Sequence, residues 1–373
     1  FMKYTLAGAY DSNIALLLTV GSTRLETYQQ LAETIRQTRM RGKDLATNLE
    51  FHYGLVNWFI ARNVNARPTT RFIVPYLTAV GELKQQANNF DLSYAYQALG
   101  KAALATVAGD AATALSDALQ LKESLLLRPL QHLLGEPHVL SGWLSINRDC
   151  YTMIEGKISW NENPLELLAD TYHFLNMDGN NDHSDAAATI IWDHDNTILQ
   201  ESIAFYDELN NRIAAGDWVE LCSILDGDDV PTGMDAALWD RVRGAHLGFQ
   251  AGVDILAVLP SIAEATGFYE LKVNADLTVH IPERLNDPAL QAAMAKVMVP
   301  PPAAKSDEIL AESGGMFYSR ETPEHEVYVK EGDHFNAGDP LFIVEVMKMF
   351  NKFYAPFAGT IEKVIGWKTR SMR

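Results

Sequence analysis

The chain has 373 residues, of which 47% are hydrophobic and 21% charged, and its formal net charge is −18. This composition is typical of a globular protein with two or three domains, and the negative charge argues against nucleic acid as a partner. Two cysteines, Cys150 and Cys222, are too few for a disulfide framework. Neither a long apolar run nor a signal-peptide pattern is found. We therefore expect a cytoplasmic protein that does not enter a membrane.

Charge is distributed unevenly along the chain. Residues 1–90 hold 10 Lys and Arg against 6 Asp and Glu, a balance of +4, so the remaining residues carry −18 − 4 = −22. A shift of this size indicates a domain boundary near residue 90.

The N-terminal region shows the pattern of a strand followed by two helices. An apolar run predicts a strand over residues 14–20. Apolar residues then recur at spacings of three and four, which predicts a helix over residues 24–40 with Ser22 or Thr23 as its N-cap, and a second helix over residues 49–60. Asp11, just before the strand, is interpreted either as a structural carboxylate at the strand end or as a contact between subunits.

The middle of the sequence is mostly helical. Residues 267–273 alternate in polarity and are expected to pair with residues 277–281 as a β-hairpin, and residues 285–298 are expected to form a last helix. Helix-like apolar spacing, with breakers between the segments, is found over residues 92–107, 111–127, 164–175, 198–214, 235–247 and 251–265.

Several polar and aromatic groups in this region resemble sites but are better interpreted as structure. A cluster with metal-type ligands fits no known metal-binding loop and is expected to be a solvated acidic loop: Asp178, Asp182, His183, Asp185, Asp193, His194 and Asp195. Because no Gly-x-Ser-x-Gly marks a nucleophile, the helical histidines are expected to be buried and hydrogen bonded: His52, His132, His138, His173 and His246. Three aromatic residues are assigned to the core: Trp58, Phe59 and Phe72.

Near the C-terminus the pattern changes to that of a tethered β-domain. Residues 299–305 read Val-Pro-Pro-Pro-Ala-Ala-Lys, an extended and semi-rigid tether, because proline fixes φ and disfavours helix in the preceding residue. The strand-like run at residues 341–344 then leads into a tight hairpin with a single lysine, Lys348, at its tip, and a second strand follows over residues 352–357. A lysine on a rigid turn can be modified and then carry a group on a long arm.

The hairpin sequence Glu345-Val346-Met347-Lys348-Met349 resembles the biotin attachment motif of biotin carboxyl carrier domains. The resemblance covers residues 313–365 and includes Gly338-Asp339-Pro340 before the hairpin and Ala355-Pro356 after it. It implies that Lys348 is the biotinylated lysine and that Met347 and Met349, with Glu345 as a further flank, surround it as biotin protein ligase requires. Lipoyl domains use the same barrel but usually lack the paired methionines.

The carrier resemblance also implies two similar half-barrels on either side of the lysine hairpin. Only 373 − 348 = 25 residues follow Lys348, whereas 348 − 313 = 35 separate it from Ser313. We therefore expect the barrel to be incomplete or divergent at its end, since an open β-structure exposes unpaired edges.

The first 80 or so residues resemble the C-terminal end of biotin carboxylase, through a Tyr-Asp-Ser strand, the helix after it and Gly-x-x-x-x-Thr-Asn at residues 42–48. Neither Gly-x-x-x-x-Gly-Lys-Ser/Thr nor Gly-x-Gly-x-x-Gly is found, so the chain is expected to begin after the ATP site and not to activate bicarbonate alone. By position only, the helical middle region resembles the linking domain of acyl-CoA carboxylases.

These resemblances imply an α+β multidomain chain with four parts. They are an α/β remnant of the biotin carboxylase C-terminal domain (residues 1–90), a helix-rich linking domain with a β-hairpin near residues 267–281 (91–299), a Pro-rich linker (300–312) and an all-β barrel-sandwich biotinyl domain (313–373).

The implied function is that of the biotin-bearing part of a biotin-dependent acyl-CoA carboxylase, a ligase. Such a part carries carboxybiotin from the biotin carboxylase site to the carboxyltransferase site, where an acyl-CoA is carboxylated. Covalent biotin is the implied cofactor, and ATP, Mg²⁺ and bicarbonate are used by the biotin carboxylase region outside this chain. No catalytic residue and no metal ligand is assigned to the chain itself, which is expected to be inactive alone.

The implied partners are biotin carboxylase, carboxyltransferase, biotin protein ligase and the acyl-CoA substrate, within a homo-oligomeric enzyme that involves neither nucleic acid nor a membrane. An acyl-CoA is preferred to pyruvate because the middle region lacks the regular strand and helix alternation of a TIM barrel. Three alternatives stay open: a non-catalytic carrier and assembly scaffold, a carboxylase for another acceptor such as pyruvate or urea, and a lipoylated carrier.

Overall fold

The structure is a computed structural model, and it describes residues 13–40, 47–154, 157–178, 186–227, 229–298, 309, 316–322, 324–346 and 349–364. The chain divides into two compact units. Residues Leu17–Val299 form one, called the helical unit, and Phe1–Leu16 with Pro300–Arg373 form the other, called the β unit. The predicted linker at residues 300–312 lies, apart from Ile309, outside the described residues, as does Asp11.

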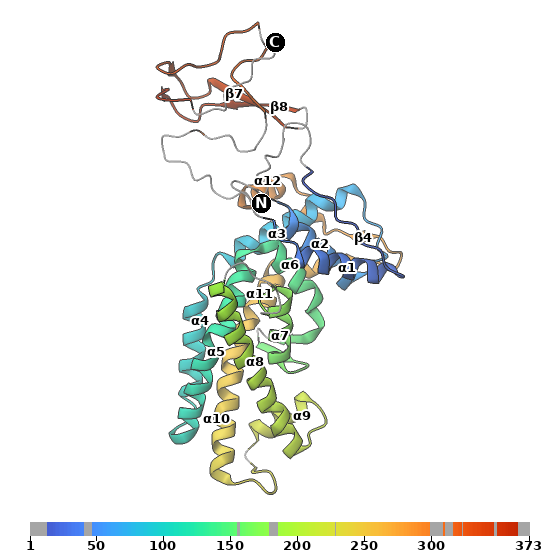
Figure 1. The fold of residues 1–373 in the computed structure, drawn as a ribbon, viewed down its shortest axis with the longest axis vertical. Coiled ribbons are helices and arrows are strands. Elements are labelled where there is room, and N and C mark those ends of the chain that lie inside the picture. Colours follow the sequence, from blue (N-terminus) through green and yellow to red (C-terminus); the bar gives the residue numbers. More distant parts are fainter. Residues whose placement is uncertain are drawn as a thin grey trace. The chain divides into compact units, whose positions relative to one another are not determined.

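The helical unit consists of α-helices with two short hairpins (Figure 1). Its first six helices are α1 Arg24–Gln37, α2 Leu49–Arg62, α3 Ile73–Ala87, α4 Leu92–Leu104, α5 Gly109–Gly135 and α6 Pro137–Ile146. The next six are α7 Pro164–Phe174, α8 Ala186–Ile213, α9 Trp218–Asp226, α10 Ala236–Val253, α11 Val258–Ala265 and α12 Pro288–Met298. The antiparallel hairpins pair β1 Tyr151–Ile154 with β2 Lys157–Trp160, and β3 Lys272–Val273 with β4 Val279–His280.

Side-chain caps begin many of these helices, as the sequence indicates. Thr23 is the N-cap of α1 and accepts a hydrogen bond from the Glu26 amide, which confirms one of the two predicted caps. Asp91, Asn163 and Asp217 cap α4, α7 and α9 in the same way. Each cap satisfies an amide that would otherwise lack a partner in the first helical turn.

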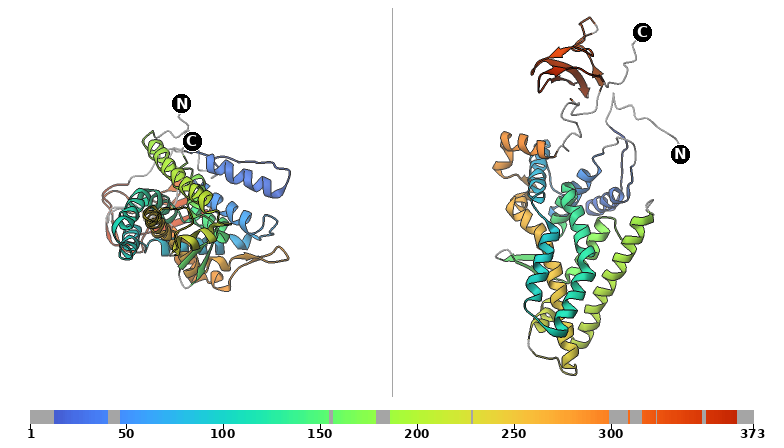
Figure 2. Two further views of the ribbon diagram at one scale, coloured as in Figure 1. Left: turned by 90° about the horizontal axis from the view of Figure 1, so that it is seen from below. Right: turned by 90° about the vertical axis from the view of Figure 1, so that its left-hand side faces the viewer.

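Close helix contacts in the unit depend on glycine. The helices α5 and α10 run side by side (Figures 1 and 2), and a Cβ atom on Gly244 of α10 would lie 2.4 Å from the Ala111 carbonyl oxygen of α5. Likewise, a Cβ atom on Gly54 of α2 would lie 2.1 Å from the carbonyl oxygen of His138 on α6. These backbones approach more closely than any side chain would allow.

One hydrophobic core extends through the helical unit, from Ala32 to Leu285. Trp58 is fully buried, and its ring centroid lies 5.0 Å from that of Phe59 and 5.1 Å from that of Phe72. The predicted core role of these three residues is therefore confirmed. The division into domains at residue 90 stays a prediction, because two domains that pack closely can share a core.

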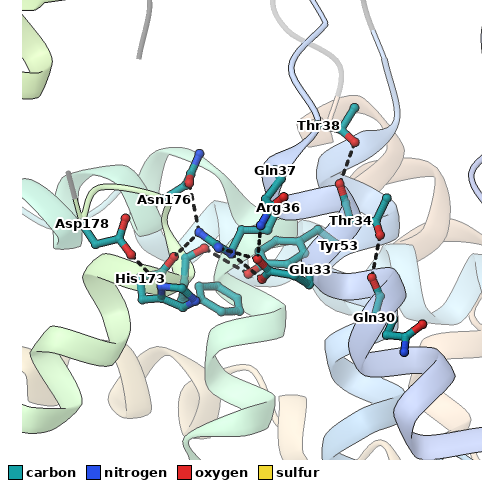
Figure 3. A network of polar contacts seen from close by, with 11 residues as sticks. Gln30, Glu33, Thr34, Arg36, Gln37, Thr38, Tyr53, His173, Asn176 and Asp178 are labelled. Atoms are coloured by element: carbon teal, nitrogen blue, oxygen red, sulfur yellow. Dashed lines mark hydrogen bonds and ion pairs between the residues drawn. The ribbon is translucent and has the colours of Figure 1, made fainter. Parts of the chain in front are cut away.

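Arg36 fastens α1 to the end of α7 (Figure 3). Its Nε and Nη2 atoms donate to the Glu33 carboxylate at 2.7 and 2.6 Å, and Nη1 donates to Asn176 Oδ1 at 3.0 Å and to the His173 carbonyl at 3.3 Å. The hydrogen bond from Arg36 is the largest cause that lowers the pKa of Glu33. This network holds the N-terminal helix on the rest of the unit.

The predicted strand at residues 14–20 is wrong within the described residues. Residues 13–20 are extended but pair with no other strand, and their alternate apolar side chains Ile14, Leu16, Leu18 and Val20 are exposed. An apolar run in the sequence favours a strand, but it does not show whether a partner strand is present to pair with it. The N-terminal region thus has no described sheet of the expected α/β remnant.

The other predicted elements match closely, with some additions. The helices expected at residues 24–40, 49–60, 92–107, 111–127, 164–175 and 235–247 are found as α1, α2, α4, α5, α7 and α10, within a few residues at most ends. The expected hairpin at 267–281 is present as the short pair β3 and β4. Not predicted were α3, α6, α9 and the hairpin β1–β2, and α8 begins twelve residues before its predicted start at residue 198.

One described helical run, Ala236–Ala265, is long and apolar enough to cross a membrane by length and composition alone. Within its apolar window, 67% of the residues are buried inside the protein. This burial is typical of a core helix that packs against other helices.

The β unit contains two small antiparallel sheets. In the first, β7 Pro340–Val346 lies between β5 Met316–Tyr318 and β8 Met349–Tyr354. In the second, β6 His334–Phe335 pairs with β9 Gly359–Thr360. Phe335, Leu341 and Ala355 form the buried core, with Ile309, Val329, Phe342 and Ile361 packed on it. Closure of the barrel stays a prediction, because residues 365–373 lie outside the described residues.

Candidate functional site

The candidate site is the hairpin that joins β7 to β8. Its register pairs Glu345 with Phe350 and Val346 with Met349. The two residues between the last pair, Met347 and Lys348, lie outside the described residues. The described strands therefore bring the chain to the lysine on one side and take it away on the other.

The hairpin is fastened to β5 close to its turn. The Tyr318 hydroxyl donates a hydrogen bond to Glu345 Oε2, and the Tyr318 ring lies 5.8 Å from that of Phe350, centroid to centroid. Glu345 thus has a described structural role, in which its carboxylate ties the strand before the lysine to a strand 27 residues earlier. A hydrogen bond to a carboxylate is among the stronger kinds in proteins, so this contact ties β7 to β5 at Glu345.

Two turns of the same design hold the strands that lead to the hairpin. Gly338 has φ +91° and its amide donates to the Ala355 carbonyl, while Asp339 accepts from the Asn336 amide at 2.8 Å. Gly332, with φ +93°, and Asp333 make equivalent contacts at the other end of the unit. Only glycine adopts this left-handed conformation at little cost, which explains the Gly-Asp pairs that precede β6 and β7.

Another lysine, Lys352, lies on β8 but is engaged. Its Nζ is 3.2 Å from Glu321 Oε2 and 5.5 Å from the centroid of the Tyr328 ring. The hydrogen bond with Glu321 is the largest cause that raises the pKa of Lys352. A protonated, paired amine is a poor nucleophile, so Lys352 is not suited to accept an acyl group at neutral pH.

The acidic cluster of the helical unit is not a single solvated loop. Asp193, His194 and Asp195 lie in α8, and Asp195 is 1% exposed, with its Oδ2 3.1 Å from both the Arg128 Nε and the Tyr172 hydroxyl. Asp182, His183 and Asp185 lie outside the described residues. Among the residues that the structure describes, no group of three or more His, Cys, Asp or Glu could hold a metal ion.

The helical histidines differ from the expectation that all are buried. His52, His132 and His173 are exposed, and His173 Nδ1 lies 2.6 Å from Asp178 Oδ2. His246 is buried, accepts or donates at Nδ1 with the Tyr206 hydroxyl at 3.0 Å, and burial lowers its pKa to about 4. Burial is also the largest cause that raises the pKa of both Cys150 and Cys222 to about 12. A thiol with so high a pKa is a weak nucleophile.

Comparisons with known proteins concern the β unit most directly. Residues 311–368 match the family model described as "Biotin-requiring enzyme". The chain is 29% identical over 111 residues to the biotin carboxyl carrier protein of acetyl-CoA carboxylase of Chlamydia trachomatis serovar D, and 31% identical over 110 residues to that of Chlamydia muridarum. These matches cover 29% and 28% of this chain and, in each case, 66% of the relative.

The protein of the same name from Haemophilus influenzae is 39% identical over 51 residues, which are 14% of this chain and 33% of that protein. The chain thus spans slightly less than two thirds of the chlamydial relatives and one third of the third. No solved structure matches the chain. The family model covers none of residues 1–310, so the predicted kinship of that region to biotin carboxylase and its linking domain stays a prediction.

Proposed function

We propose that this chain, whose residues 311–368 form a biotinyl domain related to the biotin carboxyl carrier protein of acetyl-CoA carboxylase, is the biotin-bearing part of a biotin-dependent acyl-CoA carboxylase. Lys348 is the attachment residue. The observation that carries the proposal is the β7–β8 register, which leaves Met347 and Lys348 as the connection of a hairpin inside the family match.

The described residues around the hairpin suit an attached prosthetic group. Lys352, the nearby lysine on β8, is engaged by Glu321 and so does not compete for the attachment, while Glu345 is engaged by Tyr318. Phe350, two residues after Lys348, is 64% exposed and offers an apolar surface to a visiting protein. Joined to the lysine through an amide, biotin would supply a ureido nitrogen that accepts and releases a carboxyl group.

The chain's own part in this function is presentation. The two Gly-Asp turns and the Tyr318–Glu345 contact tie the strands that flank Lys348 to the rest of the β unit, while the Pro-rich segment after the helical unit is a tether in sequence. Rigid presentation on a tether lets one lysine visit two active sites at a high effective concentration. The helical unit would dock the carboxylase components, biotin carboxylase with its ATP, Mg²⁺ and bicarbonate, and the carboxyltransferase.

An acyl-CoA is the proposed acceptor, and the cytoplasm the proposed compartment. The names of the relatives support the acceptor, because each is a carrier of acetyl-CoA carboxylase. Both cysteines are free, in agreement with a reducing compartment. When a carboxyltransferase is added to the chain that carries carboxybiotin, the carboxyl group should leave biotin only if an acyl-CoA is present to accept it. Release with pyruvate or urea instead would contradict the acceptor but not the carrier role.

Intact-mass measurement after co-expression with biotin protein ligase tests the attachment directly. The wild-type chain and Lys352→Arg should both gain one biotin-sized increment, whereas Lys348→Arg should gain none. A lipoyl-sized increment, or biotin on Lys348→Arg, would contradict the proposal. Lys352→Arg is the matched control because it removes a lysine of the same hairpin that is already paired.

A further inference from the structure

Among the residues that the structure describes, the outer edge of strand β2 in the helical unit has no backbone partner. The strand pairs with β1, and the Asn161 amide donates to the Cys150 carbonyl just beyond the strands. In an antiparallel ladder, alternate residues direct both backbone groups to the partner strand. Because Asn161 and therefore Ser159 face β1, Ile158 and Trp160 direct their N–H and C=O groups to the other side, where the described residues make no backbone hydrogen bond to them.

A cleft of about 550 Å³ runs along this edge. Three consecutive residues of β2, Ile158 to Trp160, line it, and because side chains alternate between faces, we interpret this lining as a cleft that reaches the strand from its edge. The facing wall is one side of α9 with Gln250 of α10: Trp218, Val219, Cys222, Ser223 and Asp226. The volume lies within the range typical of ligand sites.

The walls of the cleft combine apolar with polar side chains, and its surroundings are acidic. Its apolar lining is Ile158, Trp160, Trp218 and Val219, of which Trp160 is only 6% exposed and Val219 is 58% exposed. Residues 216–229 contain five acidic residues and no basic one. Of these, Asp226 lies in the cleft wall and is exposed, and His246 Nε2 lies 3.8 Å from its Oδ1. Partial burial raises the pKa of this carboxyl, and Arg243, which donates to the Leu225 carbonyl, is close enough to lower that pKa in part.

We propose that this cleft receives an extended segment of a partner protein, which adds a third strand along β2, packs an apolar side chain against Trp160 and Trp218, and directs a lysine or arginine to Asp226. Unpaired strand edges are templates for such strand addition, in which backbone hydrogen bonds give affinity and side-chain pockets give specificity. Asp226 in the cleft wall and the acidic residues near it in sequence favour a segment that carries positive charge. The proposal stands independently of biotin attachment, because it concerns only the helical unit.

Binding of synthetic peptides to the full-length chain tests the proposal. The probes are N-acetylated heptapeptides that alternate threonine with valine, leucine or phenylalanine and carry one terminal lysine, and their binding is followed through tryptophan fluorescence. We expect at least one member of this panel to saturate the chain. Its copy with N-methyl groups on the edge-facing amides should bind at least tenfold more weakly, since N-methylation removes the donors that pair with β2.

Two variants and one exchange measurement locate the site. Ile158→Pro removes an outward amide while the amides that face β1 remain, so it should abolish binding without unfolding the hairpin. Val219→Asp should weaken binding, and Leu238→Asp, at another exposed apolar position on α10 outside the cleft, should not. On binding, the amides of Ile158 and Trp160 should gain protection from hydrogen exchange, whereas that of Ser159 should change little.

Several outcomes would overturn the proposal. The proposal fails if no peptide of the panel shows saturable binding, or if binding is unaffected by N-methylation and by Ile158→Pro. It also fails if Leu238→Asp weakens binding as much as Val219→Asp does. Self-association of the chain that disappears in Ile158→Pro would show that a second copy, and not a partner segment, covers this edge.

Discussion

Substitution of Tyr318 by phenylalanine tests whether the hydrogen bond to Glu345 stabilises the lysine hairpin close to its turn. The change removes only the hydroxyl that donates to Glu345 and keeps the ring that contacts Phe350. A hydrogen bond to a charged group contributes roughly 1.5–3 kcal/mol when the partners are buried. Because Glu345 is only partly buried, water replaces some of the lost contact, and we expect a cost of about 1 kcal/mol.

The measurement is native-state hydrogen exchange of the amides in residues 344–346 and 349–351. A cost of about 1 kcal/mol corresponds to roughly fivefold more opening, and therefore to exchange about fivefold faster. In a β unit of this size, the same cost should lower the melting temperature by about 4–8 °C. Glu345→Gln, which keeps an acceptor but removes its charge, should lie between the wild type and Tyr318→Phe.

Tyr354→Phe is the matched control, since Tyr354 lies at the far end of β8 from Glu345 and its ring is exposed. It should leave both exchange and melting unchanged. If Tyr318→Phe exchanged no faster than Tyr354→Phe, the contact would add nothing to the hairpin, and rigid presentation of Lys348 would need another cause.

Three further predictions concern the rest of the chain. Gly338→Ala should destabilise the β unit by about 1–2 kcal/mol in thermal denaturation, because φ at this residue is +91°. The new methyl group would meet no other atom, so the cost comes from the backbone alone. Gly135→Ala, which also has open space but no positive φ, should not destabilise the protein. Gly54→Ala should lower the stability of the helical unit in urea by about 1–3 kcal/mol despite its better helix propensity, because the Cβ atom would meet the His138 carbonyl. Burial lowers the pKa of His246 in the folded chain to about 4, so between about pH 6.5 and 4 the unfolded chain binds a proton that the folded chain does not. The free energy of unfolding should therefore fall by up to about 3 kcal/mol as the pH drops from about 6.5 to 4. His246→Gln should reduce this pH dependence, and an unchanged dependence would contradict its origin in His246.

Local signals in the sequence predicted most helices because each signal and its effect lie within one turn. Thr23 caps α1 through the Glu26 amide only three residues away, and the predicted helix at 49–60 needed only its own apolar periodicity. The helix α3 was missed because Pro75 near its start resembles a breaker, although proline is tolerated in a first turn. Its true partners, α12 and α6, lie far away in sequence.

Features that depend on distant partners could not be predicted. The apolar run at residues 14–20 predicts a strand, yet no described strand pairs with it. Asp195 was assigned to a solvated loop because its neighbours in sequence are acidic, whereas Arg128 and Tyr172, from two other helices, bury it. The Glu345 carboxylate shows the same limit, since only the fold brings Tyr318 beside it.

The separation of the two hydrophobic cores bears directly on the carrier role. Among the described residues, the cluster of the helical unit and the cluster around Phe335, Leu341 and Ala355 share no member. A domain that must leave one active site for another cannot depend for its folding on contacts that break when it moves. Gly54→Ala should therefore weaken the helical unit while biotin attachment at Lys348 proceeds at the wild-type rate. If attachment fell in step with the stability of the helical unit, the biotinyl domain would fold only on that unit, and a travelling lysine would be physically untenable.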